Sequence, residues 1–372
     1  MSAVSLPWPT SGPVPLPGRA CSCRDCAFWT GDGGHGGPAT VEPLCSGCNS
    51  DCSYCGCAHA EASAPQGACD RCPIRCPSRS DIAEWMADLG GTLTFDGLRL
   101  GGRLPAELPS FIPQVDGSVV SELDRGLRWP AYAVGLRRVF SLASHVVYPR
   151  FAGNDVHRVL GLAPGQLAVL AGYGVDPLVE AFWTYRRRDR LVERIVAQGW
   201  DVVLAPNYSI YGNWPRIEHL INMRRSIMMA AEFAAAGAVV VPNVYWFRLE
   251  DLRRWADWSL EATPPAIAVN LQTVRENSNW ESWSLPGLSW LAENLPATLP
   301  VIVTGLSRAD RIAGLVELFG TRLTVISQNP MQYALHGAVM TQDGRQDLHA
   351  RTPDAFAATV RYMASLLPGG AP

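Results

Sequence analysis

The chain contains no lysine: all 31 of its basic residues are arginine. Without a lysine amine, the protein can neither form a Schiff base with a carbonyl substrate nor carry the lysine of a Walker-type phosphate loop. No stretch approaches the roughly 20 uninterrupted apolar residues of a membrane helix. The first 19 residues also lack the basic and apolar regions of a secretory signal. The sequence therefore predicts a cytoplasmic protein with no membrane partner.

Cysteine is absent after residue 76, and all 11 cysteines lie between Cys21 and Cys76. Their short spacings let several thiolates converge on one ion or cluster. The odd number and the cysteine-free remainder argue against a disulfide-stapled secreted domain. We therefore expect residues 1–80 to form a metal-binding or iron–sulfur module whose fold depends on metal. The candidate ligands are Cys21, Cys23, Cys26, His35, Cys45, Cys48, Cys52, Cys55, Cys57, Cys69, Cys72 and Cys76.

The cysteine groups admit more than one occupant. The first group, at 21–26, forms a plausible Cys3His zinc site with His35. Its spacing is similar to that of tRNA-guanine transglycosylases, which implies a base-exchange enzyme with structural zinc. The last group, at 69–76, resembles the end of a ferredoxin-type run, with proline after the final cysteine. One or two [4Fe-4S] clusters, or a cluster together with Zn²⁺, remain open.

From residue 81 onward, short apolar runs alternate with helical segments. We expect strands at 93–98, 167–172, 201–205, 239–241, 267–271, 301–304 and 323–327, with an ambiguous one at 131–140. We expect helices at 81–90, 177–198, 215–236, 249–260, 285–294, 308–319 and 353–367. Repeated βα units predict an α/β, TIM-barrel-like body over residues 81–340, followed by a C-terminal helix and tail at 341–372. No GxGxxG motif follows a strand, which disfavours a Rossmann fold.

Polar residues follow several of the expected strands. In a parallel barrel the reactive groups lie just beyond the carboxyl ends of the strands. Repeated amides with arginines there suit a polar small molecule or a nucleotide or nucleic acid, although each residue could simply cap the following helix. The expected set lacks a conventional acid–base pair, which favours chemistry supplied by a cofactor. The candidate catalytic residues are Asn207, Tyr208, Asn243, Asn270, Gln272, Arg275 and Glu276.

The segment 48–55 reads Cys-Asn-Ser-Asp-Cys-Ser-Tyr-Cys. This resembles the three-cysteine motif of radical S-adenosylmethionine enzymes, which usually follows the first barrel strand in that family. The resemblance implies a [4Fe-4S] cluster on Cys48, Cys52 and Cys55, S-adenosylmethionine on its open iron, and an external electron donor. A fourth thiolate from Cys45 would instead close the site, which would then be structural or electron-transferring.

The middle of the chain has a second resemblance. Segment 206–211 reads Pro-Asn-Tyr-Ser-Ile-Tyr, segment 222–225 reads Asn-Met-Arg-Arg, and segment 239–246 reads Val-Val-Val-Pro-Asn-Val-Tyr-Trp. Residues 165–330 thereby resemble an uncharacterised domain family of phages and mobile elements. This implies a fold and a mobile-element ancestry, but no activity.

Together these features predict an iron–sulfur enzyme of the radical S-adenosylmethionine type that acts on a polar, nucleotide-derived substrate. Two alternatives stay open. One is a zinc-binding module that recognises nucleic acid or protein without catalysis. The other is a base-exchange or hydrolytic barrel enzyme with structural zinc.

Overall fold

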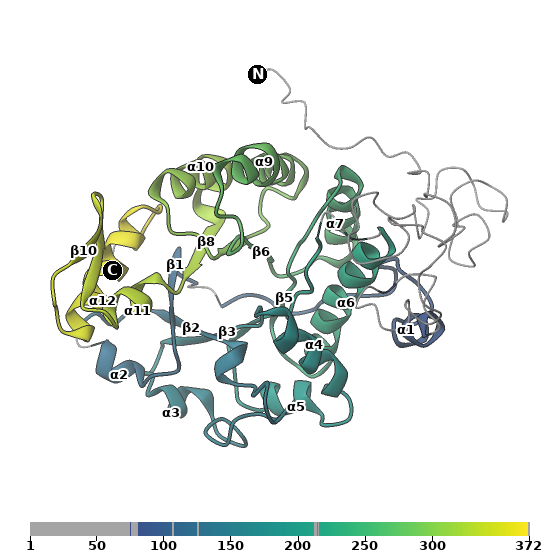
Figure 1. Cartoon of the computed structure of the whole chain (residues 1–372), viewed down its shortest axis with the longest axis horizontal. Helices are drawn as coiled ribbons and strands as arrows, with labels where there is room; N and C mark the ends of the chain where they lie inside the picture. The colour runs from purple at the N-terminus through teal and green to yellow at the C-terminus, as the bar shows by residue number, and fades with distance from the viewer. Residues whose placement is uncertain are drawn as a thin grey trace, which may run out of the picture.

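The computed structural model describes Arg75 and residues 81–105, 108–124, 126–211, 214 and 216–370. Within these residues, eight parallel strands form one sheet in the order β5-β4-β3-β2-β1-β8-β7-β6. Helices surround the strands on the outside (Figure 1). The alternation of strands and helices in the sequence predicted this TIM-barrel-like α/β fold. The strands are β1 (Phe111–Val115), β2 (Ala131–Gly135), β3 (Leu167–Ala171), β4 (Val202–Leu204), β5 (Val240–Val241), β6 (Ile267–Asn270), β7 (Val301–Thr304) and β8 (Leu323–Ser327).

The two end strands of the sheet meet just beyond β5, so the barrel is nearly closed. Asn243 bridges in parallel to Ala268 of β6. The Val244 amide donates to the Ala268 carbonyl at 2.7 Å, and the Ala268 amide donates to the Pro242 carbonyl at 2.8 Å. The residues just beyond β5 therefore join the two end strands of the sheet.

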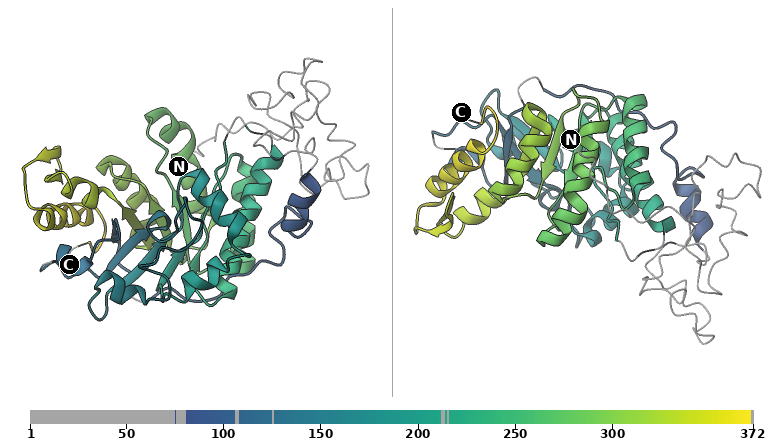
Figure 2. Two further views of the ribbon diagram at one scale, coloured as in Figure 1. Left: turned by 60° about the horizontal axis from the view of Figure 1, so that its bottom comes forward. Right: turned by 90° about the horizontal axis from the view of Figure 1, so that it is seen from above.

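The helices form an outer layer, and α1 lies outside that layer beside α6 (Figures 1 and 2). An antiparallel hairpin, β9 (Ala338–Thr341) with β10 (Gly344–Asp347), precedes the last helix. That helix stacks Phe356 on Tyr132 of β2, with ring centroids 6.4 Å apart. The helices are α1 (Ile82–Asp88), α2 (Val120–Leu123), α3 (Val156–Leu160), α4 (Asp176–Tyr185), α5 (Leu191–Val196), α6 (Arg216–Ala235), α7 (Leu249–Ala262), α8 (Asn277–Asn279), α9 (Leu285–Asn294), α10 (Ala309–Phe319), α11 (Asn329–Ala334) and α12 (Thr352–Ser365), with short 3-10 or π turns η3 (Leu136–Arg138), η4 (Trp280–Ser284) and η5 (Gly320–Arg322).

Strand alternation divides the core into an interior and an outer part, because successive side chains point to opposite faces. The interior cluster is small and fully buried, and its members are aliphatic residues and alanines. The larger side chains on the other face, such as Phe111 and Tyr132, pack with the helices in the outer cluster. The barrel interior is therefore a packed core below its mouth. The interior residues are Ile112, Ala131, Ala133, Val169, Val202, Leu204, Val241, Ala266, Ala268, Ile302 and Ile326.

One predicted strand is wrong, and one observed strand was not predicted. The segment 93–98 is irregular chain rather than a strand, and Phe95 packs its ring 4.5 Å from that of Trp255. Strand β1 was not predicted, because Pro113 lies at its centre and proline is unusual inside a sheet. The ambiguous segment 131–140 contains β2 in its first half. The remaining six predicted strands are confirmed as β3 to β8.

The long helix expected at 177–198 is two helices, α4 and α5. Arg190, immediately before α5, has a left-handed backbone with φ of 51°. A left-handed residue cannot continue a right-handed helix. The apolar periodicity on either side conceals this break, because both helices turn an apolar face to the barrel.

Candidate functional site

Polar side chains form the upper edge of the barrel interior at the carboxyl ends of the strands. Side chains two residues apart on a strand share a face. The residues two positions beyond the interior residues Ile112, Val241, Ala268 and Ile302 therefore face the mouth. These residues are Gln114, Asn243, Asn270 and Thr304. The mouth thus carries amides and a hydroxyl above an apolar plug.

On the β1–β3 side of the mouth, polar groups satisfy one another. The buried Gln114 amide oxygen accepts a hydrogen bond from the Tyr173 hydroxyl. Gly135 of β2 leaves room for this amide, since a Cβ there would lie 3.1 Å from Gln114 Nε2. Burial raises the pKa of Tyr173, and the neighbouring Thr304 and Arg137 offset this only in part. The phenol therefore stays protonated as a hydrogen-bond donor at neutral pH.

On the β4–β6 side, buried amide oxygens lack partners. Asn243 is 0% exposed, and its amide nitrogen donates to the Ala205 carbonyl. Asn207 is 6% exposed. Among the described residues, neither Asn243 Oδ1 nor Asn207 Oδ1 has a hydrogen-bond partner. Each unsatisfied buried acceptor costs about 1–3 kcal/mol, so a ligand that donates hydrogen bonds would be stabilised here.

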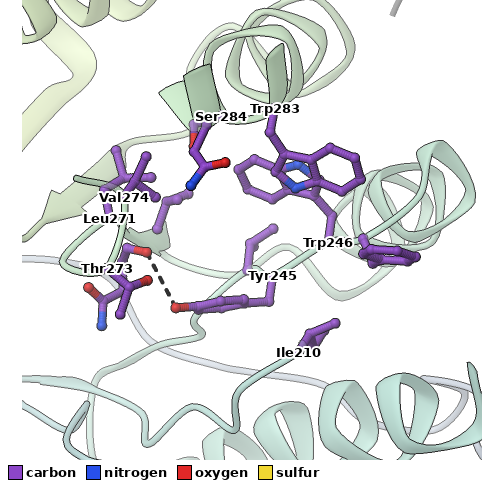
Figure 3. A pocket seen from close by; sticks show the side chains of 13 residues that line it. Ile210, Tyr245, Trp246, Leu271, Thr273, Val274, Trp283 and Ser284 are labelled. Carbon is purple, nitrogen blue, oxygen red and sulfur yellow. Dashed lines mark hydrogen bonds between the residues drawn. The ribbon is translucent and has the colours of Figure 1, made fainter. Parts of the chain in front are cut away.

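Tyr245 lies between these amides and the adjacent pocket. Its hydroxyl donates to the Asn270 carbonyl at a long 3.4 Å (Figure 3). Burial raises the pKa of Tyr245 to about 12, although the nearby Asn207 side chain acts in the opposite direction. The phenol is therefore a neutral group that can donate or accept a hydrogen bond at the pocket's edge.

A pocket of about 310 Å³ opens beside Tyr245 at the carboxyl ends of β5 and β6. Trp246 and Trp283 line one side of it in Figure 3, and Leu271 and Val274 line another. Its size is at the lower end of the range for small-molecule sites. The lining residues are Ile210, Val244, Tyr245, Trp246, Phe247, Val269, Asn270, Leu271, Thr273, Val274, Asn279, Trp283 and Ser284.

Two local features place the indoles of this pocket. Gly287 of α9 backs onto Trp246, where a Cβ would lie 2.5 Å from the ring. Trp283 belongs to the π-helical turn η4, and its ring lies 5.3 Å from that of Phe247. The buried Trp246 Nε1 has no hydrogen-bond partner among the described residues. A π-helical turn inside a helix frequently marks a functional site.

The structure brings together three of the predicted site residues: Asn207, Asn243 and Asn270 lie at the mouth beside Tyr245. Gln272, Arg275 and Glu276 lie further out, exposed in the loop after β6. The carbonyls of Arg275 and Glu276 accept hydrogen bonds from Arg311, at 3.0 and 3.3 Å.

Tyr208 is placed elsewhere. It is 1% exposed, and its ring centroid lies 3.7 Å from the guanidinium carbon of Arg225 and 5.7 Å from the ring of Trp183. Burial raises the pKa of its phenol. Tyr208 therefore packs against α4 and α6 on the outer face of the sheet instead of lining the pocket.

Sequence reasoning missed the aromatic walls of the pocket. Tyr245, Trp246 and Phe247 follow β5 directly, and this aromatic run just past a strand end was a usable signal. Trp283 was not predictable in the same way, because it reaches the pocket from a π-helical turn.

The predicted metal and cofactor ligands (His35 and the cysteines of residues 21–76) all lie outside the described residues. Within the described part of the chain, no group of three histidine, cysteine, aspartate or glutamate side chains could hold a metal ion. No helix in that part is long and apolar enough to cross a bilayer.

The fold and the pocket define a parallel (β/α)-barrel protein with a ligand-sized site at the carboxyl ends of its strands. No protein-family model matches this chain, and no curated protein matches it.

Proposed function

We propose that this protein is an enzyme that binds a small, planar, polar molecule of the nucleobase or nucleoside class at its barrel mouth. The observation that supports this is the aromatic pocket lying beside buried amide oxygens without partners. Aromatic walls stack on a planar ring, and amides bond to its polar edge. The pocket lining contains no arginine or lysine, so the proposed ligand needs no phosphate group.

We further propose that the chemistry comes from an iron–sulfur cluster on Cys48, Cys52 and Cys55, with S-adenosylmethionine as cosubstrate and an external electron donor. The resemblance of segment 48–55 supports this assignment. The nearby Asp176 carboxylate already accepts hydrogen bonds from Ser209 Oγ and the Tyr211 hydroxyl, each at 2.7 Å. A mouth whose nearby carboxylate is occupied in this way fits chemistry supplied by a cofactor.

The binding proposal is tested by calorimetry with the four common ribonucleosides and their free bases. Trp283→Ala should weaken the affinity for the preferred compound by about tenfold or more, since base–aromatic stacking contributes about 1–3 kcal/mol. The matched control is Trp290→Ala, which removes a half-buried indole of α9 that does not line the pocket. Binding that is absent throughout, or equal losses in both variants, would contradict the proposal.

The cluster proposal is tested separately by metal analysis of anaerobically purified protein. A [4Fe-4S] centre should give a brown protein, and replacing Cys48, Cys52 and Cys55 together by Ala should remove about four irons per chain. Reduced protein should also cleave S-adenosylmethionine. Cys45→Ala is the control: equal loss of iron there would indicate a closed four-thiolate centre instead.

A second candidate is a base-exchange or hydrolytic barrel enzyme with structural zinc. The observation that favours it is the loop after β1, which begins Asp116-Gly117-Ser118 and contains no cysteine. In the radical S-adenosylmethionine family the three-cysteine motif usually follows the first barrel strand, and β1 is the first strand of the described sheet. A colourless protein that holds zinc, with no iron, would favour this candidate.

A further inference from the structure

Arg75 takes part in a buried ionic network on the outside of the barrel. Its guanidinium donates to the carboxylate of Glu218, and at 2.7 Å to that of Glu180. Its backbone amide also donates to Glu218 Oε2 at 2.6 Å. Arg225 donates to both oxygens of Glu180, at 2.8 and 2.7 Å. Arg75 and Arg225 thus share Glu180 between them.

The carboxylates of this network depend on both arginines. Burial would raise the pKa of Glu180, but Arg225 and Arg75 hold it below its usual value. Burial raises the pKa of Glu218, which is 0% exposed, and Arg75 offsets this in part. Without Arg75, Arg225 would be the one arginine among the described residues left to lower the pKa of both carboxylates. Removal of one partner from a buried ion pair is strongly destabilising, because it leaves a charge unpaired.

Aromatic rings complete the environment of Arg75. Its guanidinium lies 4.2 Å from the ring centroid of Trp85 on α1. The Arg225 guanidinium lies 4.8 Å from the ring of Trp183 on α4. Such cation–π contacts are strongest where water is excluded, and Arg75 is only 8% exposed. Helices α1, α4 and α6 therefore form a site that encloses an arginine side chain.

We propose that this site is the docking surface for the segment that carries the last cysteine group, residues 69–76, with Arg75 as its anchor. Arg75 itself belongs to this segment, which reads Cys-Pro-Ile-Arg-Cys at 72–76. Cys76 directly follows this anchor in the sequence, and Cys72 precedes it by three residues.

The docking surface connects to the pocket through one loop. Glu218 and Asn222 lie in the first half of α6, which follows the mouth side of β4. The Asn222 amide donates to Glu218 Oε1 at 3.2 Å and to the Ser209 carbonyl at 2.9 Å. Ile210, the next residue, lines the pocket. A metal group on Cys69, Cys72 and Cys76 would thus be anchored beside the loop that shapes the pocket, a consequence that rests on the proposed function.

Hydrogen exchange at the Arg75 amide tests the proposal, because that amide donates to Glu218 Oε2 in the docked arrangement. In full-length protein as purified, Arg75→Met should speed exchange in the peptide spanning residue 75 by about tenfold or more, as expected when a buried charge pair is broken. The matched control is Arg99→Met, which breaks the exposed Arg99–Glu261 pair at 3.4 Å. It should leave exchange around residue 75 unchanged.

A double variant keeps the test valid if Arg75→Met destabilises the barrel. Arg75→Met with Glu218→Gln removes both charges, so Glu218 is not left as an unpaired buried carboxylate. This double variant should release the segment, while the barrel unfolds at the same temperature as in the wild type. Unchanged exchange around residue 75 in both variants would overturn the docking proposal. Exchange requires neither ligand nor turnover, so that result would leave nucleoside binding standing. Conversely, exchange could be fast in the variants while the wild type binds no nucleoside. That outcome would refute the proposed function and leave the docking proposal standing.

Discussion

The two sides of the barrel mouth differ in whether their buried amide oxygens have hydrogen-bond partners. On the side of β1–β3, the buried Gln114 amide is paired with the Tyr173 hydroxyl, and Gly135 makes space for the contact. On the side of β4–β6, Asn207 and Asn243 are as deeply buried, yet their oxygens have no partner among the described residues. We name these the closed side and the open side.

The difference shows which polar groups serve the fold and which are available to a ligand. A paired group stabilises the structure by about 0.5–1.5 kcal/mol, whereas an unpaired buried one costs about 1–3 kcal/mol. The closed side therefore contributes to stability. The open side gives up stability and adjoins the aromatic pocket, a combination typical of a binding site.

The largest expected effect concerns Gly172, where the end of β3 meets the end of β4. A Cβ at this position would lie 2.2 Å from the Leu204 carbonyl oxygen and 2.7 Å from the Pro206 nitrogen. Because both neighbours are backbone atoms, Gly172→Ala should lower the free energy of unfolding by about 3 kcal/mol or more. Urea denaturation measures this change.

Gly101→Ala is the matched control, since an added methyl there meets nothing within 4 Å. It should change the unfolding free energy by less than about 0.5 kcal/mol. If the two alanine variants were equally stable, the strand ends would not approach as closely as described, and the boundary between the two sides would be wrong.

Tyr173→Phe tests the closed side. It removes the donor to Gln114 and leaves a buried amide oxygen unsatisfied, which should cost about 1–3 kcal/mol of stability. Ligand affinity should be unchanged, because the pocket lies on the other side. Tyr148→Phe removes the hydroxyl of an exposed tyrosine and serves as the control. Calorimetry measures nucleoside binding by Tyr173→Phe. A loss of binding would show that both sides of the mouth belong to one ligand site.

Asn207→Leu tests the open side, and we expect the opposite result: nucleoside affinity should fall. Leucine has a similar size and removes an amide oxygen that has no partner among the described residues. It also removes the amide's hydrogen bond to Tyr245, so stability should fall by no more than about 1.5 kcal/mol. Nucleoside affinity should fall by about tenfold, because a donor on the ligand loses its acceptor. A stability loss as large as that of Tyr173→Phe, with affinity intact, would show that Asn207 is structural.

The barrel was predictable from sequence because its strands are short apolar runs between amphipathic helices, as in β7 (Val301–Thr304). Strand β1 escaped prediction because a proline at its centre contradicts the strand pattern. The break at Arg190 escaped as well, because a left-handed residue leaves the apolar periodicity intact. Local backbone conformation, more than hydrophobic pattern, limited the prediction.

The site was predictable only in part. Asn207, Asn243 and Asn270 follow strands, so the rule for parallel barrels places them at the mouth. That rule cannot tell inward from outward side chains, and Tyr208, one residue beyond Asn207, packs against Arg225 instead. The role of Arg75 was not predictable, since its partners lie more than 100 residues away in the chain.

The smallest expected effect is that of Tyr245→Phe, at the edge between the open side and the pocket. The hydroxyl's bond to the Asn270 carbonyl is long, at 3.4 Å, so its loss should cost less than about 1 kcal/mol at neutral pH. The difference in stability between the wild type and Tyr245→Phe should change with pH only under alkaline conditions. The folded pKa is raised from 10.0 to about 12, so between those values the native state retains a proton that the unfolded state has lost. The wild type should therefore lose stability relative to Tyr245→Phe as pH rises through this interval. Denaturation at a series of pH values measures the difference; a constant difference would mean that the Tyr245 phenol is not buried beside the pocket.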